Sequence, residues 1–362
     1  MLALFKETQH LPGKVDELWW LREKWRRSLD KGVIHTHAEL EADWQIAFPE
    51  QEPELISSWV DCMSLEWIIE GISNDVREIF CHHTELIEAV GSGRQLISSP
   101  LQPEDWDLWV ETLACRLKLD FNFTNPCGSA HLKFQNTEWR ATLLHGSIGP
   151  TGKSKVFLRQ LAVNAYPLNS FSLDSEGEDL VKALMMNREN ILVAGATGSG
   201  KTSLLSSLLA EIDHDDHVVL LEDTQEISAA LPRLTRMLSS KLPGRSLSDY
   251  LAHALRLSPD RIVVGEMRSH EVIPYLLAMN TGHKGLVSTL HASSAMDALL
   301  RVAQLFVLAS GQKDMSYQEV LRLVSRNVGV VVFVEKRQIK QIIRVFGCDG
   351  DQPMFDVIWG VQ

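Results

Sequence analysis

The chain has 362 residues, of which 45% are hydrophobic, and a formal net charge of −12 with a pI near 5.6. A chain of this length and composition can bury a substantial core and divides more naturally into two domains than one. The acidic balance argues against a protein that grips nucleic acid through a general basic surface, so no direct general nucleic-acid binding is expected.

Membrane insertion and secretion are not expected either. No apolar run approaches the roughly 18 to 20 residues that a membrane helix needs, and the opening stretch MLALFKETQH becomes polar too soon for a signal peptide. The five cysteines are odd in number and widely spaced, which fits reduced thiols better than disulfides. No Cys-x-x-Cys pair occurs, so no structural zinc is expected. The sequence predicts a cytoplasmic protein.

Residues 1–54 are predicted to form a helical N-terminal extension. An apolar stripe at helical spacing runs along it, made by Leu18, Leu21, Trp25 and Leu29. In one interpretation this stripe docks on a membrane platform protein or on lipid headgroups. In the other it packs on its own domain, and this second interpretation is favoured because it is the commoner fate of such a stripe.

After residue 54 the composition and the predicted structure change twice before the second domain begins. Residues 55–165 mix helical and strand-like stretches and are expected to form a smaller α+β domain. Residues 166–178 contain proline, asparagine, several serines and acidic residues, a composition typical of a linker. Residues 179–345 are expected to form the second domain and residues 346–362 a C-terminal tail.

In the second domain short apolar strands alternate with helices, a pattern typical of a mainly parallel α/β sheet. Four of these strands end at residues suited to phosphate, metal or water. They are Ile191–Ala194 before Gly195, Val218–Leu221 before Glu222, Ile262–Val264 before Gly265 and Glu266, and Leu286–Leu290 before His291. Because open α/β sheets bind ligands at the carboxyl ends of their strands, these residues are expected to share one site.

The first of these strands runs directly into a phosphate-loop sequence, GxxxxGK[ST], that opens a helix. Its residues are Gly195, Ala196, Thr197, Gly198, Ser199, Gly200, Lys201 and Thr202, followed by Ser203. The glycines let backbone N–H groups turn toward phosphate oxygens, and the helix N-terminus and the lysine add positive charge. Lys201 is expected to bind phosphate and Thr202 to hold Mg²⁺, so ATP and Mg²⁺ are the expected ligands.

Carboxylates at the next two strand ends are candidates for hydrolysis, which needs groups that hold the metal and its waters and that orient the attacking water. Glu266 is the candidate on the metal side, and a strand-end surface carboxylate is the alternative. Glu222, Asp223 and Glu226 crowd like charge after a buried strand, which is costly unless a cation or a catalytic role offsets it. Glu226 is the candidate that orients water, and a solvated acidic turn is the alternative.

Two histidines flank the last strand, His283 before it and His291 at its end. An imidazole can hydrogen-bond a terminal phosphate or a carboxylate, so both are candidate sensors, with His291 the better one and a structural role the alternative. In the first domain, Arg140 and Arg159 occupy adjacent strand-like segments. A guanidinium from outside the phosphate-loop domain can stabilise developing phosphoryl charge, a role that spacing alone leaves open.

Four segments together resemble the secretion and pilus ATPase superfamily that serves type II secretion, type IV secretion and type IV pili. They are the phosphate loop 195–202, the acidic segment 221–227, the segment 258–268 and the histidine segment 281–292. Residues 278–283 look most like the branch that contains the Tad/Flp pilus ATPases and the type IV secretion traffic ATPases. The resemblance covers about residues 179–340 and implies a RecA-like phosphate-loop domain with a smaller N-terminal α+β domain.

The resemblance also implies a homo-oligomeric ring, a hexamer, in which the N-terminal domain closes over the phosphate-loop domain as ATP is hydrolysed. Arg140 and Arg159 lie in the segments that match the family's paired arginines, which reach the nucleotide. Arg268 and Arg301 match two further family arginines. An inner-membrane platform protein is the implied partner, so the chain is expected to associate peripherally with the inner membrane.

The sequence departs from the family in places. It has no tetracysteine zinc module and no match to the C-terminal signature of the retraction motors, and Ser269 and Ser293–Ser294 replace the Gly and Asn-Ser usual in the Tad-like branch. The expected function is ATP hydrolysis that drives pilus assembly or protein secretion. DNA transfer, pilus retraction and a nucleotide-binding scaffold without turnover are the alternatives. A small-molecule kinase is disfavoured because no acceptor pocket or basic lid is recognisable.

Overall fold

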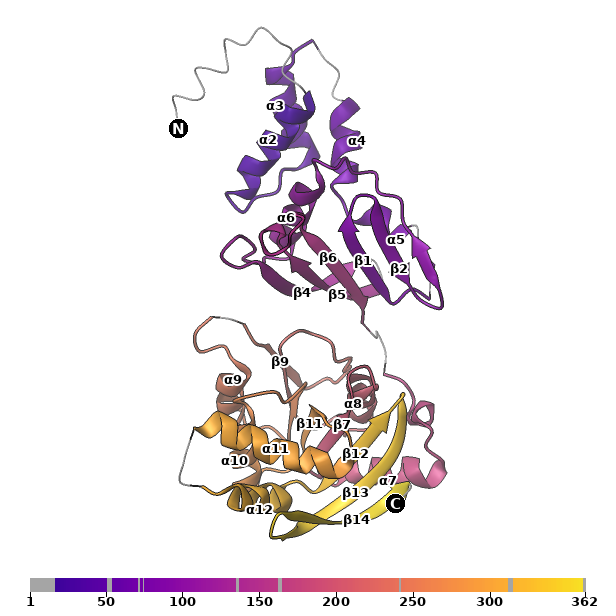
Figure 1. Cartoon of the computed structure of the whole chain (residues 1–362), viewed down its shortest axis with the longest axis vertical. Helices are drawn as coiled ribbons and strands as arrows, with labels where there is room; N and C mark the ends of the chain where they lie inside the picture. The colour runs from indigo at the N-terminus through magenta and orange to yellow at the C-terminus, as the bar shows by residue number, and fades with distance from the viewer. Residues whose placement is uncertain are drawn as a thin grey trace. The chain divides into compact units, whose positions relative to one another are not determined.

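The computed structural model describes residues 17–50, 54–70, 72–73, 75–134, 137–161, 165–240, 242–311 and 315–360. The chain divides into two compact units, Met1–Leu161 and Ala162–Gln362. Figure 1 shows the elements of both units. Among the helices of the described ranges, none has the length and apolar character of a bilayer-spanning segment.

The N-terminal unit combines a six-stranded antiparallel sheet with helices, in the strand order β3-β2-β1-β6-β5-β4. Its strands are β1 (Glu78–His83), β2 (Leu86–Val90), β3 (Arg94–Leu96), β4 (Cys127–Phe134), β5 (Thr137–Leu144) and β6 (Lys155–Gln160). Its helices are α2 (Glu17–Leu29), α3 (His37–Ala47), α4 (Glu54–Cys62), α5 (Glu66–Glu70), α6 (Trp106–Arg116) and the 3-10 helix η2 (Gly146–Ile148).

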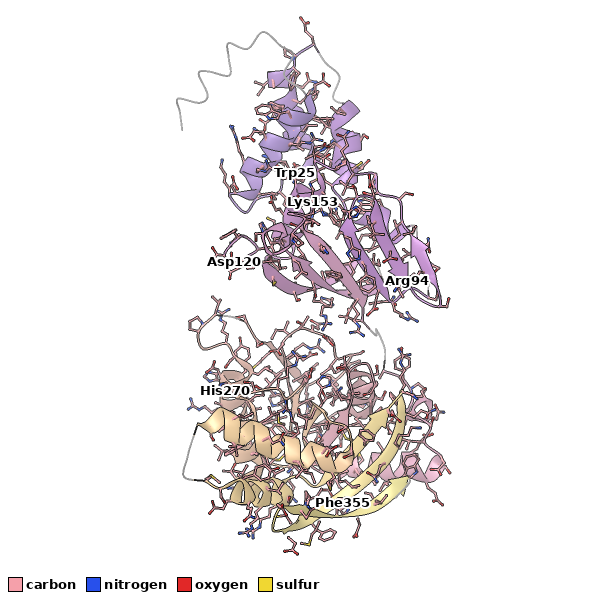
Figure 2. All side chains as sticks on the ribbon, viewed as in Figure 1. Trp25, Arg94, Asp120, Lys153, His270 and Phe355 are labelled. Carbon is pink, nitrogen blue, oxygen red and sulfur yellow. The ribbon has the colours of Figure 1, made fainter. Side chains whose placement is uncertain are left out.

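Helices α2 and α3 form part of the core of this unit. Their inward side chains are at most 1% exposed and join one apolar cluster with α6 and the sheet; these are Leu21, Trp25, Leu40 and Trp44. Figure 2 shows Trp25 among the helices, where its indole N–H donates to Thr112 Oγ1 at 2.7 Å. The apolar stripe therefore packs on its own unit, which confirms the favoured interpretation. The expectation of a separate extension is corrected for the described part of 1–54, and residues 1–16 and 51–53 lie outside the described residues.

The C-terminal unit is built on an eight-stranded, mainly parallel sheet in the order β14-β13-β12-β7-β11-β10-β8-β9. Its strands are β7 (Ile191–Gly195), β8 (Val218–Glu222), β9 (Leu234–Leu238), β10 (Arg261–Val264), β11 (Leu286–His291), β12 (Val330–Glu335), β13 (Gln338–Asp349) and β14 (Gln352–Gly360). Its helices are η3 (Leu168–Phe171), α7 (Ser175–Met186), α8 (Lys201–Ala210), α9 (Leu247–Ala254), α10 (Val272–Asn280), α11 (Ala295–Ser310) and α12 (Tyr317–Asn327).

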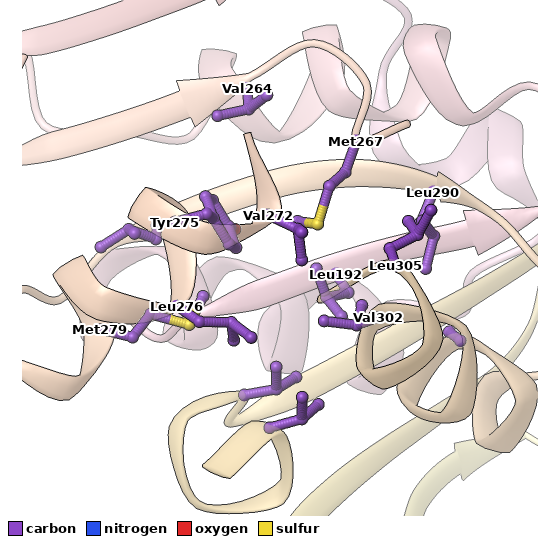
Figure 3. Close-up of a cluster of buried hydrophobic side chains, with 14 of the residues drawn as sticks. Leu192, Val264, Met267, Val272, Tyr275, Leu276, Met279, Leu290, Val302 and Leu305 are labelled. Carbon is purple, nitrogen blue, oxygen red and sulfur yellow. The ribbon is translucent and has the colours of Figure 1, made fainter. Parts of the chain in front are cut away.

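Alternate residues of the central strands face two different helical layers. In β7, Leu192 and Ala194 pack with α9 to α12, whereas Ile191 and Val193 pack with α7 and α8. Figure 3 shows side chains of α10 and α11, such as Leu276 and Val302, gathered around Leu192. Because both faces of these strands are covered, each strand is a continuous apolar run, which is why all four could be recognised in the sequence.

The expected linker, residues 166–178, is corrected because most of it is structured within the C-terminal unit. Leu168, Phe171 and Leu173 are buried in the layer formed with α7 and α8. Asp174 caps α7, its side chain accepting the backbone N–H of Gly177 at 2.8 Å. Polar residues that look like a linker in the sequence are here the cap and first turn of a helix.

The expected tail, residues 346–362, is also corrected over its described part. Residues 346–349 continue β13, and β14 pairs antiparallel along it to form the edge of the sheet. Phe355 and Val357 of β14 pack on the core. An antiparallel edge strand has one solvent-facing side, so its sequence alternates and gives a weaker signal than the central strands. Residues 361–362 lie outside the described residues.

Candidate functional site

The loop between β7 and α8 requires glycine at several positions. Gly198 and Gly200 have φ of +73° and +102°, a region that residues with a Cβ avoid. Gly195 has no room for a side chain, because a Cβ there would lie 2.3 Å from the carbonyl oxygen of Val334 in β12. The loop therefore curls tightly before α8, whose first N–H groups have no partner within the helix and can bind an anion.

Lys201, the first residue of α8, is folded into this loop and is only 6% exposed. Its Nζ donates to the carbonyl oxygens of Gly195 at 3.0 Å and Ala196 at 2.8 Å. Burial lowers the pKa of Lys201, while the nearby Glu266 carboxylate opposes that shift. A phosphate entering the loop would offer the ammonium group charged oxygens in place of two neutral carbonyls, which favours the exchange.

His291, at the end of β11, lies between Lys201 and Glu266. Its Nδ1 is 3.2 Å from Lys201 Nζ, and its Nε2 is 2.8 Å from Glu266 Oε1. An ammonium group can only donate and a carboxylate can only accept. We therefore assign the tautomer in which Nδ1 accepts from Lys201, while Nε2 lies beside Glu266 Oε1, an oxygen without a hydrogen-bond partner in the described residues. Burial and Lys201 lower the pKa of His291 and Glu266 raises it, with a net lowering that keeps the ring neutral at neutral pH.

Glu266 follows β10 and lies near Arg268, His291 and Lys201. Burial acts to raise its pKa, but Arg268, His291 and Lys201 outweigh that effect and hold the pKa below its usual range. The Arg268 guanidinium bonds Glu266 directly, and its Nη1 lies 3.7 Å from Asp223 Oδ2. The turn itself is fixed by the buried Glu271, which accepts the backbone N–H groups of Arg268 and, at 2.6 Å, Ser269. Glu266 is thus ionised and held at this edge of the sheet.

Three carboxylates lie at the carboxyl end of β8, Glu222, Asp223 and Glu226, and they differ in their exposure. Glu222 is buried, and its Oε1 accepts the backbone N–H groups of Glu226 at 2.9 Å and Ile227 at 2.8 Å. Its Oε2 lies 3.5 Å from Nε of Arg236 in β9. Burial raises the pKa of Glu222, and these backbone and arginine contacts oppose it. Glu222 is therefore an anchor for the loop that carries Glu226, rather than a group that faces the phosphate loop.

The oxygen donors expected to hold a magnesium ion are both at this edge. Thr202 occupies the first turn of α8, next to Lys201, and Glu266 reaches the same lysine through His291. A hydroxyl and a carboxylate are hard oxygen ligands of the kind that Mg²⁺ binds alongside substrate phosphates and water. Ser199 Oγ is buried and has no hydrogen-bond partner in the described part of the chain. The residues present fit a metal-bound triphosphate.

His283 does not lie with this group in the C-terminal unit, and its role as a sensor stays a prediction. It precedes β11, so it lies at the amino edge of the sheet, whereas the site is at the carboxyl edge, where His291 pairs with Gly195. Its ring Nδ1 is 3.2 Å from both Thr281 Oγ1 and the carbonyl oxygen of Ala278. Within this unit, His283 therefore contacts the C-terminal end of α10.

Arg140 and Arg159, in the N-terminal unit, are brought together by the sheet. They are directly paired in the antiparallel ladder of β5 and β6, and Arg159 Nε lies 3.5 Å from Glu78 Oε1 in β1. Arg301 is an exposed residue of α11 in the other unit. The contact of the two paired arginines with nucleotide stays a prediction.

Sequence reasoning missed three residues that shape the site, Arg236, Glu271 and Arg337. Arg236 gave no signal because its partner, Glu222, is on a different strand. Glu271 looks like an ordinary acid at a helix start, yet it is only 6% exposed. Arg337, in the turn after β12, donates its backbone N–H to the Ser199 carbonyl oxygen at 2.8 Å. Only the folded sheet brings this turn to the phosphate loop.

A cavity of about 480 Å³ lies elsewhere, in the N-terminal unit. Its lining includes His82, His83, Trp106, Lys153 and Lys155, and Lys153 is labelled in Figure 2. Lys153 Nζ is already engaged by the Pro103 carbonyl oxygen at 3.3 Å and Asp107 at 3.4 Å. None of the sequence-predicted site residues lines this cavity, so it is separate from the phosphate-loop site.

The chain is similar to known proteins in both sequence and fold. A family model described as "Type II/IV secretion system protein" matches residues 129–354. The chain is 30% identical over 272 residues to the conjugal transfer protein TrbB of Rhizobium radiobacter, covering 72% of this chain and 80% of that protein. It is 34% identical over 150 residues to the type IV secretion system protein VirB11 of Bartonella henselae, covering 40% of this chain and 42% of VirB11.

Two solved structures support the fold. The ATPase DotB of Legionella pneumophila aligns with a TM-score of 0.58 at 20% identity, covering 82% of this chain and 78% of that one. The pilus retraction motor PilT with bound ADP aligns with a TM-score of 0.58 at 21% identity, covering 82% of this chain and 83% of that one. Both carry the same mixed α/β architecture. The chain belongs to the type II/IV secretion system protein family and is an ATPase of that family.

Proposed function

We propose that the chain is a ring-forming motor in which ATP hydrolysis drives movement between the two units and so powers pilus assembly or protein secretion across the envelope. The observation that carries this proposal is the chain of contacts from Lys201 through His291 to Glu266 beside the phosphate loop. A lysine, a neutral imidazole and an ionised carboxylate at one loop form a set that binds a terminal phosphate and senses its loss.

The proposed roles follow from the geometry of each side chain. Lys201 leaves the loop carbonyls to bind phosphate oxygens, as do the N–H groups of residues 195–203. His291 then exchanges its bond with Lys201 for one with the terminal phosphate, which links phosphate occupancy to Glu266. Glu226, on the loop anchored by Glu222, orients the attacking water. Arg268, which contacts Glu266 and lies 3.7 Å from Asp223, helps to hold the pKa of Glu266 below its usual range.

Magnesium is proposed as the metal, held by Thr202 and, partly through water, by Glu266. When bound, it neutralises charge on the phosphates and polarises them for attack. Arg140 and Arg159 are proposed to reach the nucleotide from the N-terminal unit when the two units close. Their joint positive charge suits the charge that develops on the transferred phosphoryl group.

The assembly and its location are also proposals. A homo-oligomeric ring, a hexamer, would place each nucleotide where neighbouring units move against one another. The chain would work at the cytoplasmic face of the inner membrane, recruited by a platform protein of a pilus or secretion system. The mostly buried stripe of α2 supports recruitment through a partner rather than direct lipid binding, because Leu21 and Trp25 are used within the unit.

Conjugative DNA transfer is the second candidate, favoured by the length of the match to TrbB, a conjugal transfer protein. The net charge of −12 argues that any such role would act through partners rather than through direct contact with DNA. Pilus retraction is supported by the shared fold of PilT alone. A nucleotide-binding scaffold without turnover is disfavoured, because Lys201, Glu226 and Glu266 are all present.

The proposal is tested by measuring phosphate release from ATP and Mg²⁺ by the full chain over a range of protein concentrations, with sedimentation at each concentration. Release without any acceptor, with a specific activity that rises as the oligomer forms, is expected for a ring motor. ATP binding without phosphate release in the concentrated oligomer would identify a scaffold instead. Turnover that requires an added phosphate acceptor would identify a kinase.

A further inference from the structure

The turn between β12 and β13 has an unusual composition for its shape. Its two central residues, Lys336 and Arg337, have φ of +50° and +60°, and the flanking Glu335 and Gln338 are paired across the hairpin. Two-residue turns with positive φ at both positions are normally built from Asn-Gly or Gly-Gly. Two long cationic side chains in this conformation carry a steric cost of roughly 1 kcal/mol or more each. Such a cost is often retained where the side chains have a function.

This turn forms one wall of the phosphate loop. Besides the bond from Arg337 N–H to the Ser199 carbonyl oxygen, the loop glycines are fitted against the hairpin. A Cβ on Gly200 would lie 3.2 Å from Arg337 Cγ and 3.3 Å from its Cα. The stem of Arg337 thus lies across the last glycine before α8, with its guanidinium exposed beside the loop.

The two cations of the turn differ from their neighbours on the same hairpin. Lys340 Nζ donates to Gln338 Oε1 at 2.6 Å, and Arg344 Nη1 pairs with Glu189 at 3.0 Å. Within the described residues, neither Lys336 nor Arg337 has an ion pair or a side-chain hydrogen bond. Two exposed positive charges without protein partners therefore stand next to an anion-binding loop.

The order of the sheet fixes which side of the loop they occupy. β11 and β10, which deliver His291 and Glu266, lie on one side of β7, and β12 and β13 lie on the other. The terminal phosphate must face His291 and Glu266 for the proposed hydrolysis. The turn therefore faces the opposite side of the bound nucleotide.

We propose that the Lys336–Arg337 turn is a nucleotide subsite, in which Arg337 with support from Lys336 binds the ribose and inner-phosphate portion that ATP and ADP share. This inference rests on the proposed nucleotide site at the phosphate loop. It assigns the strained turn a role in retaining nucleotide through the hydrolysis cycle, because its contacts are the same before and after the terminal phosphate leaves. A guanidinium can donate two parallel hydrogen bonds to a phosphate, which suits this position.

The test replaces the turn with the sequence that its backbone prefers. The double variant Lys336→Asn, Arg337→Gly keeps the positive φ angles and the backbone N–H that bonds Ser199, but removes both charges. Its Kd for ADP and for ATP is expected to rise by a similar factor of about ten, the effect of losing one or two charge-assisted hydrogen bonds. Its Tm should be unchanged or higher, because the turn strain is relieved. Lys340→Ala, which removes a nearby charge from the same hairpin, should leave both Kd values unchanged.

Each other outcome overturns the assignment. Unchanged Kd values in the double variant, with normal binding by the unaltered chain, would make the turn purely structural and leave the proposed function standing. Weaker binding of ATP alone would place the turn at the terminal phosphate. An unaltered chain that binds neither nucleotide would remove this inference together with the function on which it rests.

Discussion

Arg140 of β5 and Arg159 of β6 are direct partners across an antiparallel ladder. Side chains in such positions have Cβ atoms about 4.5–5.5 Å apart, and like charges there destabilise a sheet. The same row continues to His131 on β4 and Glu78 on β1. Glu78, 3.5 Å from Arg159, reduces the repulsion within this row. An anion with several negative charges would be attracted to this pair.

If the pair acts on the transition state, Arg140→Ala should lower kcat by at least about a hundredfold while the Kd for ATP changes less than about threefold. The reason is that charge on the transferred group develops only as the reaction proceeds, so a group that stabilises this charge affects kcat more than ATP affinity. The measurement is steady-state phosphate release together with equilibrium binding of a fluorescent nucleotide.

Arg94→Ala is the matched control for this variant. It removes an exposed arginine from β3 of the same sheet, one that pairs with Glu88 at 3.3 Å. Little change in kcat is expected from it. If Arg140→Ala behaved like Arg94→Ala, or reduced binding and turnover equally, the role in the transition state would be refuted.

Substitutions of Glu222 and Glu226, the two glutamates at the carboxyl end of β8, should differ in their effect on the free energy of unfolding. Glu222→Ala leaves two backbone N–H groups without their partner and removes the carboxylate beside Arg236, and should lower the free energy of unfolding of the C-terminal unit by about 2–4 kcal/mol. Glu226→Ala removes a half-buried side chain that is proposed to orient the attacking water, so phosphate release should fall while stability falls less than in Glu222→Ala. Urea unfolding of both variants gives the comparison. Equal losses of stability would mean that Glu222 is no anchor.

The lowered pKa of His291 predicts a pH effect on stability. In the unfolded chain this ring protonates near its ordinary pKa of about 6.5, whereas the folded chain resists protonation until a lower pH. The unfolded state therefore binds more protons in that interval, and stability falls as pH drops through it. His291→Gln lacks this contribution, so its Tm should decline less than that of the unaltered chain between about pH 6.5 and pH 5. Parallel curves for the two proteins would contradict the lowered pKa.

Gly195→Ala tests the contact between the phosphate loop and β12. The new Cβ would lie 2.3 Å from the Val334 carbonyl oxygen, so the loop or the strand must move. A loss of stability of about 1–3 kcal/mol and a clear loss of ATP affinity are expected. Gly149→Ala is the control, because Gly149 has an ordinary φ of −112° and open space around it. Thermal unfolding and nucleotide binding that changed equally in both variants would show that the loop does not depend on this contact.

The central strands and the residues at their carboxyl ends could be predicted because burial on both faces produces continuous apolar runs. β7, β8, β10 and β11 each end within one residue of the expected position. The glycine-rich loop after β7 was equally clear, since its spacing and its place between a strand and a helix agree.

The remaining parts depend on contacts that spacing does not encode. Glu222 looked like a catalytic candidate because its partner Arg236 is brought to it only when β8 and β9 pair. The position of His283 could have been predicted from the sequence alone, since a residue before a strand lies at the edge opposite the strand's carboxyl end. The Lys336–Arg337 turn gave no signal, because only the order of the sheet places β12 next to β7.

The most direct test of the whole account compares ATP binding and single-turnover hydrolysis in the unaltered chain, Lys201→Ala and Glu266→Gln. The account predicts that Lys201→Ala loses tight ATP binding, because the loop keeps its shape but lacks its charge. It predicts that Glu266→Gln retains binding within a few-fold and hydrolyses at least about a hundredfold more slowly. Full hydrolysis by Glu266→Gln, or unchanged binding by Lys201→Ala, would contradict a nucleotide site organised by Lys201, His291 and Glu266.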